Sequence, residues 1–342
     1  MNSAKLIRWF EQNKRDLPWR HTKDPYKIWL SEIILQQTRV AQGLPYYIKF
    51  IKQFPDVYAL ANSDEQEVLK LWQGLGYYTR ARNLHHTAKE IVHRYNGRFP
   101  STYAKLLQLK GVGEYTAAAI ASFCFDQAVP VIDGNVFRVL SRLKGIAVPI
   151  NTSEGKKIFK ITAAQSMDTS QPARYNQAVM EFGALQCLPQ QPLCKTCPLQ
   201  TECVAYQTGK VERLPVKLPK IKIKKRTFHF VLVYSNDKIL LQKRQNDDIW
   251  KNLYQLPLIE TPNQKSPSNN DWKLFYDKWQ ITPEHKPEHL SQTNHKLTHQ
   301  HLNIHFWKLK TTGLSLQAVD IKQLKLYPLP VVIANFLDNY NL

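Results

Sequence analysis

The sequence of 342 residues contains no long hydrophobic run. No apolar stretch approaches the length of about eighteen residues that a membrane-spanning helix needs, and the first residues read as an amphipathic helix rather than a signal peptide. We therefore expect a cytoplasmic protein without membrane segments. Hydrophobic residues still make up 43% of the chain, which suits globular folding, and the length favours two domains over one.

Acidic residues are scarce relative to basic ones. The chain has 27 acidic and 47 basic residues, for a formal net charge of +20. The excess is uneven: residues 206–226 carry eight basic residues and one acidic residue, and most of the remaining excess precedes them. This balance indicates a polyanionic partner, whose phosphate groups make binding dependent on salt.

Cysteine is also scarce, but four of the five cysteines fall within seventeen positions. Cys187, Cys194, Cys197 and Cys203 form the pattern C-x6-C-x2-C-x5-C. In a cytoplasmic protein, clustered thiols indicate a metal site rather than disulfides. Structural zinc sites usually show two C-x2-C pairs, so the uneven spacing favours an iron–sulfur cluster, with zinc as the alternative. Cys124 stands alone in an apolar helix and is expected in the core.

A change of composition near residue 206 divides the chain. Residues 1–205 show helical periodicity and no convincing strand. The predicted N-caps are Ser3, Asp24, Ser63 and Ser101, and the predicted helix stops are Gly43, Gly74 and Gly97. Residues 206–226 predict an extended basic linker. Residues 227–342 predict an α+β domain with an antiparallel sheet, including a hairpin around residues 235–237 and a polar loop at 261–270.

One glutamate stands inside an otherwise apolar helix. Asp24 and Pro25 predict the start of a helix that continues through the segment WLSEIILQQT, residues 29–38. Glu32 lies one step from the apolar face, on which Gln37 also falls. Its helical neighbours are Ile28, Trp29 and Leu35. By spacing alone, the favoured interpretation is a solvated polar residue beside the core.

A turn with two glycines, Gly111-Val112-Gly113, separates two predicted helices. The first is expected over residues 101–110, and the second begins at Glu114. Glycine lets backbone N–H groups approach a phosphate closely, and the following helix N-terminus adds its dipole. An ordinary connection between two helices is the alternative. Further along, Asp133 precedes a helix expected to begin near Asn135, and spacing alone favours an N-cap role.

Taken together, these motifs resemble one enzyme superfamily. The GVG turn, the later VIDG segment and the four-cysteine loop are similar to those of the endonuclease III superfamily of DNA glycosylases. The strings WLSEIILQQTRV, GLGYYTRARNL, GVGEYTAAAI and DGNVFRVLSR resemble its adenine-specific (MutY) branch, strongly over about residues 5–205. The resemblance implies an all-α helix-hairpin-helix domain over 1–205 with one [4Fe-4S] cluster, a linker, and a Nudix-like domain over 227–342.

The resemblance also implies a reaction. Such enzymes remove adenine mispaired with 8-oxoguanine or guanine from double-stranded DNA, after the base has flipped into a pocket. Glu32 corresponds to the acid that protonates adenine, and its apolar neighbours should raise the pKa of its carboxyl group. Asp133 corresponds to a carboxylate that stays ionised and stabilises the cationic sugar. Asn135 resembles a residue that positions Asp133 or the catalytic water.

Tyr115 separates two classes of this superfamily. Strand-cleaving relatives carry a lysine at the matching place as a Schiff-base nucleophile, and a tyrosine cannot form an imine. We therefore expect a monofunctional glycosylase with Tyr115 lining the pocket; nearby Lys110 and Lys144 leave weak strand cleavage open. A bifunctional pyrimidine glycosylase and a non-enzymatic iron–sulfur protein are less favoured alternatives, because both expected carboxylates are present.

Further residues correspond to DNA contacts of the family, with a monomer bound to the duplex. Gly111, Val112 and Gly113 are expected to grip the DNA backbone. Gln37, Leu75 and Tyr77 are expected to fill the gap left by the flipped base, or alternatively to serve packing. In the second domain of the family, a Phe-Ser-His loop contacts 8-oxoguanine. This chain has Leu297, Thr298 and His299 there, so polar recognition is expected without the aromatic ring.

The second domain lacks the glutamate cluster with which a Nudix hydrolase holds metal, so nucleotide hydrolysis is not expected. Seven of the eleven histidines lie there, four of them at 295, 299, 301 and 305. A zinc site is an alternative, but strand alternation accounts for them better. It places Leu302, Ile304 and Phe306 on one face and His301, Asn303 and His305 on the other.

Overall fold

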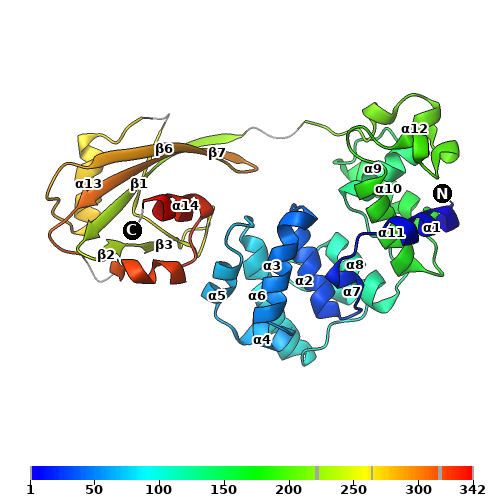
Figure 1. Ribbon diagram of the computed structural model, residues 1–342, viewed down its shortest axis with the longest axis horizontal. Coiled ribbons are helices and arrows are strands. Elements are labelled where there is room, and N and C mark those ends of the chain that lie inside the picture. The colour runs from blue at the N-terminus through cyan, green and yellow to red at the C-terminus, as the bar shows by residue number, and fades with distance from the viewer. Residues whose placement is uncertain (1, 220–222, 263–264, 315–317, 341–342) are drawn as a thin grey trace. The chain divides into compact units, whose positions relative to one another are not determined.

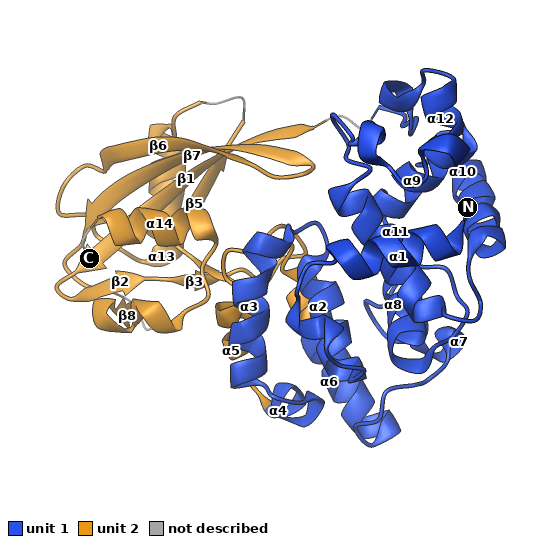
Figure 2. Cartoon of the chain, turned by 45° about the vertical axis from the view of Figure 1, so that its right-hand side comes forward, with its two compact units in different colours: residues 1–62, 83–219 blue, residues 63–82, 220–342 orange. Residues whose placement is uncertain are grey.

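The computed structural model describes residues 2–219, 223–262, 265–314 and 318–340. The chain forms two compact units (Figure 2). Residues 1–62 and 83–219 make up the first unit, and residues 63–82 and 220–342 make up the second. No helix in the described part of the chain is both long enough and apolar enough to span a membrane.

The first unit is built from helices, which confirms the predicted all-α domain. Among the described residues 2–219 there is no strand. The α-helices are α1 (Ser3–Asn13), α2 (Pro25–Leu35), α3 (Val40–Gln53), α4 (Val57–Asn62), α6 (Thr79–Tyr95), α7 (Tyr103–Leu106), α8 (Glu114–Phe125), α9 (Gly134–Lys144), α10 (Ser153–Ser166), α11 (Pro172–Leu185) and α12 (Val204–Gln207). Short 3-10 turns are η1 (Pro18–Arg20), η2 (Cys194–Thr196), η3 (Gln200–Glu202) and η4 (Val211–Arg213). The first four residues of α6 belong to the second unit.

The helix N-termini lie at or one residue from the predicted caps. Asp24 caps α2 as predicted, accepting the N–H of Tyr26 at 2.9 Å. The other three predicted caps are wrong by one position. The observed caps are Asn2, Asp64 and Thr102 in place of Ser3, Ser63 and Ser101. The side chains of Asn2 and Thr102 accept the cap hydrogen bonds, whereas the side chain of Asp64 makes none, so the local signal does not select the exact residue.

Two of the three predicted glycine stops follow helices. Gly74 and Gly97 adopt positive φ angles of +100° and +74° after α5 and α6. Gly43 was predicted wrongly, because it lies inside α3. A Cβ atom at Gly43 would stand 2.8 Å from the Leu35 side chain. This glycine therefore allows α3 to pack closely against the end of α2.

Clusters of buried side chains hold the first unit together. One joins α1, α9, α10 and α11 around buried residues such as Leu6, Leu140 and Phe159. Another joins α2 to α8 through Ile28 and small residues of α8, including Ala118 and Ala119. Small side chains let two helices approach closely. The consequence is that polar residues of α2 and α8 are brought into direct reach of one another.

The second unit contains a six-stranded sheet whose order is β6-β7-β1-β2-β8, with β5 also paired to β1 (Figure 1). The strands are β1 (Lys224–Ser235), β2 (Lys238–Leu240), β5 (Leu258–Thr261), β6 (Glu288–Lys296), β7 (Gln300–Lys310) and β8 (Ala318–Asp320). A separate two-stranded sheet is formed by β3 (Gln242–Lys243) and β4 (Tyr254–Gln255). The helices are α5 (Glu65–Leu71), α13 (Asn269–Trp279) and α14 (Val331–Asn339), with η5 (Ile321–Leu326).

The sheet is mixed, so the prediction of an antiparallel sheet is wrong for its longest pairing. β1 and β7 run parallel from Lys224 opposite Gln300 to Tyr234 opposite Lys310. The intervening chain includes α13 and is long enough for the crossover that a parallel pair requires. β1 is also buried on both faces, as central strands of helix-covered sheets are.

The local strand predictions agree better with the structure. β1 and β2 form the predicted hairpin around residues 235–237. Along β7, Leu302, Ile304 and Phe306 are buried, whereas the alternating polar residues are partly exposed, which confirms the predicted faces. β1 begins at Lys224, inside the segment expected to be linker. The polar loop ends at Ser268, which caps α13 in a capping box with Asp271.

Candidate active site

Helices α2 and α8 place Glu32 against Tyr115. Glu32 is only 6% exposed, so the solvated role that spacing alone favoured is wrong. Tyr115 lies in the first turn of α8, and its hydroxyl group donates to Glu32 Oε2 at 2.5 Å. This hydrogen bond fixes the orientation of the carboxyl group: Oε2 faces the Tyr115 phenol, and Oε1 takes no part in the bond.

Burial changes the acidity of both groups. It raises the pKa of Glu32 to about 7, aided by the charge of Asp133 and opposed by the Tyr115 hydrogen bond and the charge of Arg20. Burial and the Glu32 charge raise the pKa of Tyr115 well above its usual value. At neutral pH both the protonated and the ionised form of Glu32 are therefore populated, while Tyr115 stays protonated and acts as a hydrogen-bond donor.

Asp133 stands at the start of α9 with hydrogen-bond donors on both oxygens. Its Oδ1 accepts the backbone N–H of Val136 at 2.8 Å, which makes it the N-cap, and its Oδ2 accepts Asn135 Nδ2 at 2.8 Å. Arg138 in turn donates to Asn135 Oδ1 at 2.9 Å and orients the amide. Burial raises the pKa of Asp133, opposed by these hydrogen bonds and by the charge of Arg138. The helix terminus therefore offsets only part of the cost of burying this charge.

The turn at Gly111-Val112-Gly113 leads directly into α8. Gly111 has a φ of +76°, and a Cβ atom there would lie 2.6 Å from Asn83 Cβ. Val112 is buried, and no side chain caps the helix at Gly113, around which the space is open. The first amide groups of α8 are thus accessible to an anion. The helix before the turn is shorter than predicted, because α7 ends at Leu106 and turns continue to Val112.

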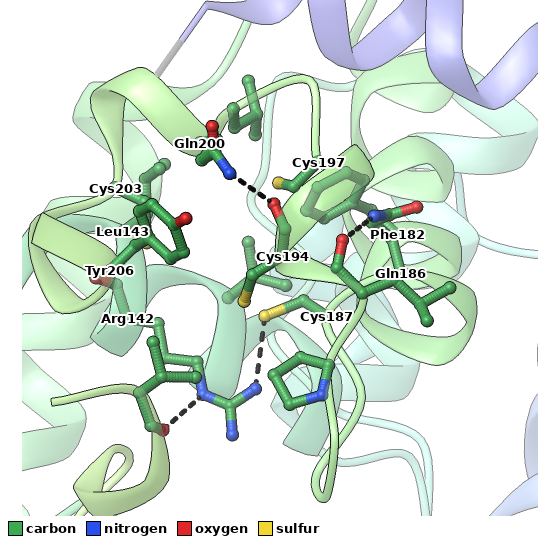
Figure 3. A pocket seen from close by; sticks show the side chains of 15 residues that line it. Arg142, Leu143, Phe182, Gln186, Cys187, Cys194, Cys197, Gln200, Cys203 and Tyr206 are labelled. Atoms are coloured by element: carbon green, nitrogen blue, oxygen red, sulfur yellow. Dashed lines mark hydrogen bonds between the residues drawn. The ribbon is translucent and has the colours of Figure 1, made fainter. Parts of the chain in front are cut away.

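The four clustered cysteines and Arg142 line one cavity (Figure 3). Arg142 is 2% exposed and donates from Nη1 to Cys187 Sγ at 3.5 Å. Burial raises the pKa of the Cys197 thiol to about 11, helped by the charges that neighbouring thiolates would carry. Such thiols ionise together only when a cationic group compensates them. Apart from Arg142 and two glutamines, nonpolar and aromatic residues complete the lining, so the site fits a thiolate-ligated group.

The other cysteine and the histidines form no comparable site. Cys124 packs with the α2–α8 core, and burial raises the pKa of its thiol to about 12. Across the described residues, no group of three His, Cys, Asp or Glu side chains is arranged to hold a single metal ion, and this applies to the four clustered cysteines as well as to the histidines at 295, 299, 301 and 305.

The second unit brings Tyr77 to the turn between β6 and β7. The hydroxyl groups of Tyr77 and Thr298 are hydrogen-bonded. Both residues line a pocket of about 410 Å³ together with Leu297, His299 and Ile249. Tyr77 is 49% exposed and has a positive φ, whereas Leu75 is buried. Of the residues expected to touch DNA, the second unit thus brings four together around this pocket, namely Tyr77, Leu297, Thr298 and His299.

Gln37 does not lie on the apolar face of α2, contrary to the sequence prediction. The helix ends at Leu35, and Gln37 follows with a φ of +57°. Its side chain is exposed. A left-handed residue turns the chain away from the helix, so the helical periodicity could not be extended to this position.

Comparison with known proteins supports the resemblance. The model of the HhH-GPD superfamily base excision DNA repair protein matches residues 30–162, and that of the NUDIX domain matches residues 228–339. The chain is 38% identical over 301 residues to the adenine DNA glycosylase of Buchnera aphidicola subsp. Baizongia pistaciae (strain Bp), covering 87% of this chain and 83% of that protein. This chain belongs to the adenine DNA glycosylase family.

Other members and structures agree with this membership. The adenine DNA glycosylase of Mus musculus is 44% identical over 225 residues, covering 62% of this chain and 44% of that protein. A thermostable thymine-DNA glycosylase is similar in structure, with a TM-score of 0.56 and 28% identity, over 60% of this chain and 95% of that one. The predicted family and the predicted two-part fold are both confirmed.

This adenine DNA glycosylase family member also contains a buried charge cluster that sequence reasoning missed. Glu181 on α11 is 1% exposed and accepts hydrogen bonds from Arg15 Nη2 at 2.6 Å and Arg20 Nη2 at 2.7 Å. Burial by itself raises the pKa of Glu181. The hydrogen bonds from Arg15 and Arg20 together have the larger effect, and the resulting pKa is about 2. A glutamate inside an apolar helix was the same signal that marked Glu32, but its partners lie more than 160 positions away.

Proposed function

We propose that this chain hydrolyses the N-glycosidic bond of adenine opposite 8-oxoguanine or guanine in double-stranded DNA and leaves the strand intact. One observation carries the proposal: in a member of the adenine DNA glycosylase family, the charge of the half-buried Asp133 helps to raise the pKa of a buried glutamate to about 7. Two carboxyl groups in unlike environments suit the division of labour in glycoside cleavage.

Glu32 is the proposed general acid. Adenine is a poor leaving group as an anion, and a proton delivered to N7 lets it leave as a neutral base. The raised pKa keeps a protonated fraction of Glu32 available at neutral pH. Because Tyr115 holds Oε2, the proton is delivered from Oε1.

Asp133 and Asn135 are proposed to serve the sugar side of the reaction. The departing base leaves an oxocarbenium-like sugar, whose positive charge the Asp133 carboxylate stabilises until water attacks. The Val136 amide and the Asn135 side chain hold the two carboxylate oxygens in place. Asn135 is itself held by Arg138, so we assign it a positioning role.

Tyr115 supports the absence of strand cleavage. A phenol whose pKa lies far above neutral cannot attack C1′ as an amine does, and it forms no Schiff base. Its proposed function is to line the pocket and orient Glu32. The chain is therefore assigned to the monofunctional class.

The proposed DNA contacts involve both units. The turn of Gly111, Val112 and Gly113 binds a phosphate through the open N-terminus of α8. Gln37, Leu75 and Tyr77 contact the bases around the flipped nucleotide. The turn of Leu297, Thr298 and His299 reads 8-oxoguanine through its hydroxyl and imidazole groups. The net charge of +20 supports binding to the duplex, which we assign to a monomer.

Residues Cys187, Cys194, Cys197 and Cys203 are proposed to hold one [4Fe-4S] cluster. When bound, such a cluster crosslinks the loop that carries its four ligands. The residues themselves place the loop against α9, because Arg142 donates to Cys187 and to four carbonyl groups of the surrounding chain. We keep 1–205, 206–226 and 227–342 as the proposed domain limits and the cytoplasm as the proposed location, where thiols stay reduced.

A single assay with three duplexes tests the proposed function. The full chain is incubated with duplexes that carry adenine opposite 8-oxoguanine, adenine opposite guanine, or thymine glycol, and each product is examined with and without alkali. We expect strand breaks only after alkali and only in the adenine strands. Release of thymine glycol, or breaks without alkali, would assign the chain to the strand-cleaving pyrimidine class instead.

A further inference from the structure

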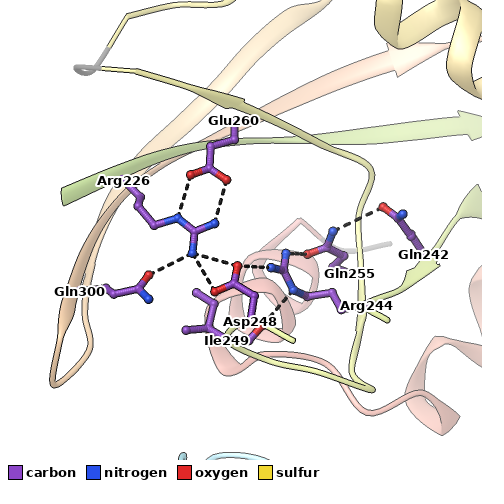
Figure 4. A network of polar contacts seen from close by, with 8 residues as sticks. All are labelled: Arg226, Gln242, Arg244, Asp248, Ile249, Gln255, Glu260 and Gln300. Carbon is purple, nitrogen blue, oxygen red and sulfur yellow. Dashed lines mark hydrogen bonds and ion pairs between the residues drawn. The ribbon is translucent and has the colours of Figure 1, made fainter. Parts of the chain in front are cut away.

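A network of polar side chains lies beside the turn between β6 and β7, with two shielded arginines at its centre. It consists of Arg226, Arg244, Asp248, Gln255, Glu260 and Gln300, and we call it the Arg226 network (Figure 4). Arg226 belongs to β1, Glu260 to β5 and Gln300 to β7, while Asp248 lies in the loop between β3 and β4. Gln255 belongs to β4, so the network connects four strands and the loop between β3 and β4.

Every part of the Arg226 guanidinium group is engaged. Nε and Nη2 donate to the two carboxylate oxygens of Glu260, both at 2.7 Å. Nη1 donates to Asp248 at 2.9 and 3.0 Å and to Gln300 Oε1 at 3.0 Å. A planar fork with five N–H groups can satisfy such a set, whereas a lysine ammonium cannot.

The network is balanced in charge, and its two arginines are shielded from water, whereas the side chains of Asp248 and Glu260 are 28% and 43% exposed. The side chains of Arg226 and Arg244 are both 9% exposed, and they share the carboxylate of Asp248. Two guanidinium groups face two carboxylates, and Arg226 lies over the Phe228 ring at 4.6 Å. Shielded, fully paired groups hold their geometry more firmly than exposed ion pairs do.

The position of Gln300 connects this network to the proposed lesion-reading turn. Gln300 directly follows His299, and its carbonyl group accepts the N–H of Leu297 at 2.8 Å. The carbonyl group of His299 accepts the N–H of Lys224, two residues before Arg226, at 3.0 Å. Asp248 and Ile249 line the same pocket as the turn. Arg226 therefore bonds both to Gln300, which closes the turn, and to Asp248, which lies in the loop on the other side of the pocket.

We propose that Arg226 is a positioning residue for opposite-base recognition. Through Gln300 and Asp248 it sets the separation between the turn of Leu297, Thr298 and His299 and the facing loop, and so determines where the hydroxyl and imidazole groups meet the oxidised guanine. This inference rests on the proposed reading of 8-oxoguanine by that turn. Arg226 does not touch the base itself; it acts through Gln300.

The test compares single-turnover rates of the full chain on adenine opposite 8-oxoguanine and adenine opposite guanine. Gln300→Leu removes the side-chain hydrogen bond from Arg226 Nη1 to Gln300 Oε1. Gln300→Glu keeps an oxygen that can accept this bond. Arg226→Lys keeps the charge and loses the fork. The matched control is Gln292→Leu, which removes an exposed contact from Gln292 of β6 to Asn303 of β7.

We expect Gln300→Leu and Arg226→Lys each to lower the ratio of the two rates roughly fivefold, the effect of about one hydrogen bond. The rate on adenine opposite guanine should change little, and Gln300→Glu and Gln292→Leu should keep the wild-type ratio. The double variant should lose no more than either single variant, because both changes break one connection. The urea midpoint of each variant shows how far folding is affected.

Several outcomes would overturn the inference. An unchanged ratio in Gln300→Leu shows that the turn is held without Arg226, whatever happens to Arg226→Lys. An equal fall on both substrates in Gln300→Leu shows a role in folding only. A wild-type enzyme with no preference for 8-oxoguanine refutes lesion reading by the turn as well, and that failure is seen in the wild type rather than in the variants.

Discussion

At the scale of single residues, burial of Glu32 raises the pKa of its carboxyl group, which suits a general acid but lowers the free energy of unfolding at high pH. The folded chain holds a proton on Glu32 up to a pH of about 7, whereas the unfolded chain releases it near 4.5. Between these values the native state binds more protons than the unfolded state, so stability falls as the pH rises. Above both values the cost is complete, at about 3 kcal/mol for a shift of this size.

Replacing Glu32 by glutamine should therefore have opposite effects on activity and stability. Glu32→Gln keeps the acceptor for Tyr115 but has no acidic proton, so we expect base removal to fall at least roughly a thousandfold while the duplex still binds. The free energy of unfolding should rise by about 2 kcal/mol at pH 8 and change little at pH 4. Urea titrations at the two pH values measure this difference. Normal turnover in the variant would exclude Glu32 as the acid.

The second residue-scale prediction concerns Tyr115. Tyr115→Lys places an amine in the first turn of α8, beside the Glu32 carboxyl group. We expect borohydride to trap a covalent DNA adduct with this variant and much less with the wild type, because only a primary amine forms an imine. Tyr115→Phe is the control, since it removes the hydroxyl group without adding an amine. Efficient trapping by the wild type would show that another lysine acts as the nucleophile.

At the scale of elements, the turn before α8 depends on glycine for two separate reasons. Gly111 has a positive φ, and Asn83 leaves no room for a Cβ atom. Gly209 has a similar φ of +64° but open space around it. The two positions therefore separate the cost of the backbone conformation from the cost of the contact.

Gly111→Ala should destabilise the protein more than Gly209→Ala does. For Gly209→Ala we expect a loss of about 1 kcal/mol, the usual cost of a left-handed alanine. For Gly111→Ala we expect about 2 to 4 kcal/mol, because the turn must also move away from Asn83. Duplex affinity, measured by fluorescence anisotropy, should fall only in Gly111→Ala. Equal losses of stability would mean that the contact with Asn83 relaxes at no cost.

At the scale of the whole molecule, the excess of positive charge should dominate binding to DNA. Residues 206–226 carry a large share of this excess, including the exposed Lys210, Lys217 and Lys225. Phosphate contacts release counterions, and each contact contributes roughly 0.9 to the slope of log affinity against log salt. The position of charge, and not only its amount, therefore decides the salt dependence.

Changing these three lysines to glutamine should lower that slope by roughly 1 to 3. The matched control changes three exposed lysines of the second unit, Lys238, Lys273 and Lys286, and alters the net charge equally. We expect the control to alter the slope much less. Anisotropy titrations between low and physiological salt measure both variants. Equal changes in slope would mean that net charge, without a defined basic segment, governs binding.

Much of the candidate site could be predicted from the sequence because the signals are local. Glu32 stands among apolar residues within one helix, Asp133 directly precedes α9, and the four cysteines occupy one short loop. Helix periodicity and turn chemistry depend on neighbours a few positions away. They were therefore sufficient for the helical fold and for the place of the hairpin turn. The choice of Glu32 and Asp133 as functional acids came from the family resemblance, because spacing alone favoured a solvated residue and an N-cap.

Only the tertiary structure decided how distant segments meet. The parallel pairing of β1 with β7, the burial of Glu181 with Arg15 and Arg20, and the Arg226 network all join residues that are far apart in the chain. The local sequence does not reveal such partners, because the sequence around a charged residue looks the same whether its side chain is solvated or paired with a distant residue. Packing selects the partner by burying both groups together, since an unpaired buried charge is too costly to retain.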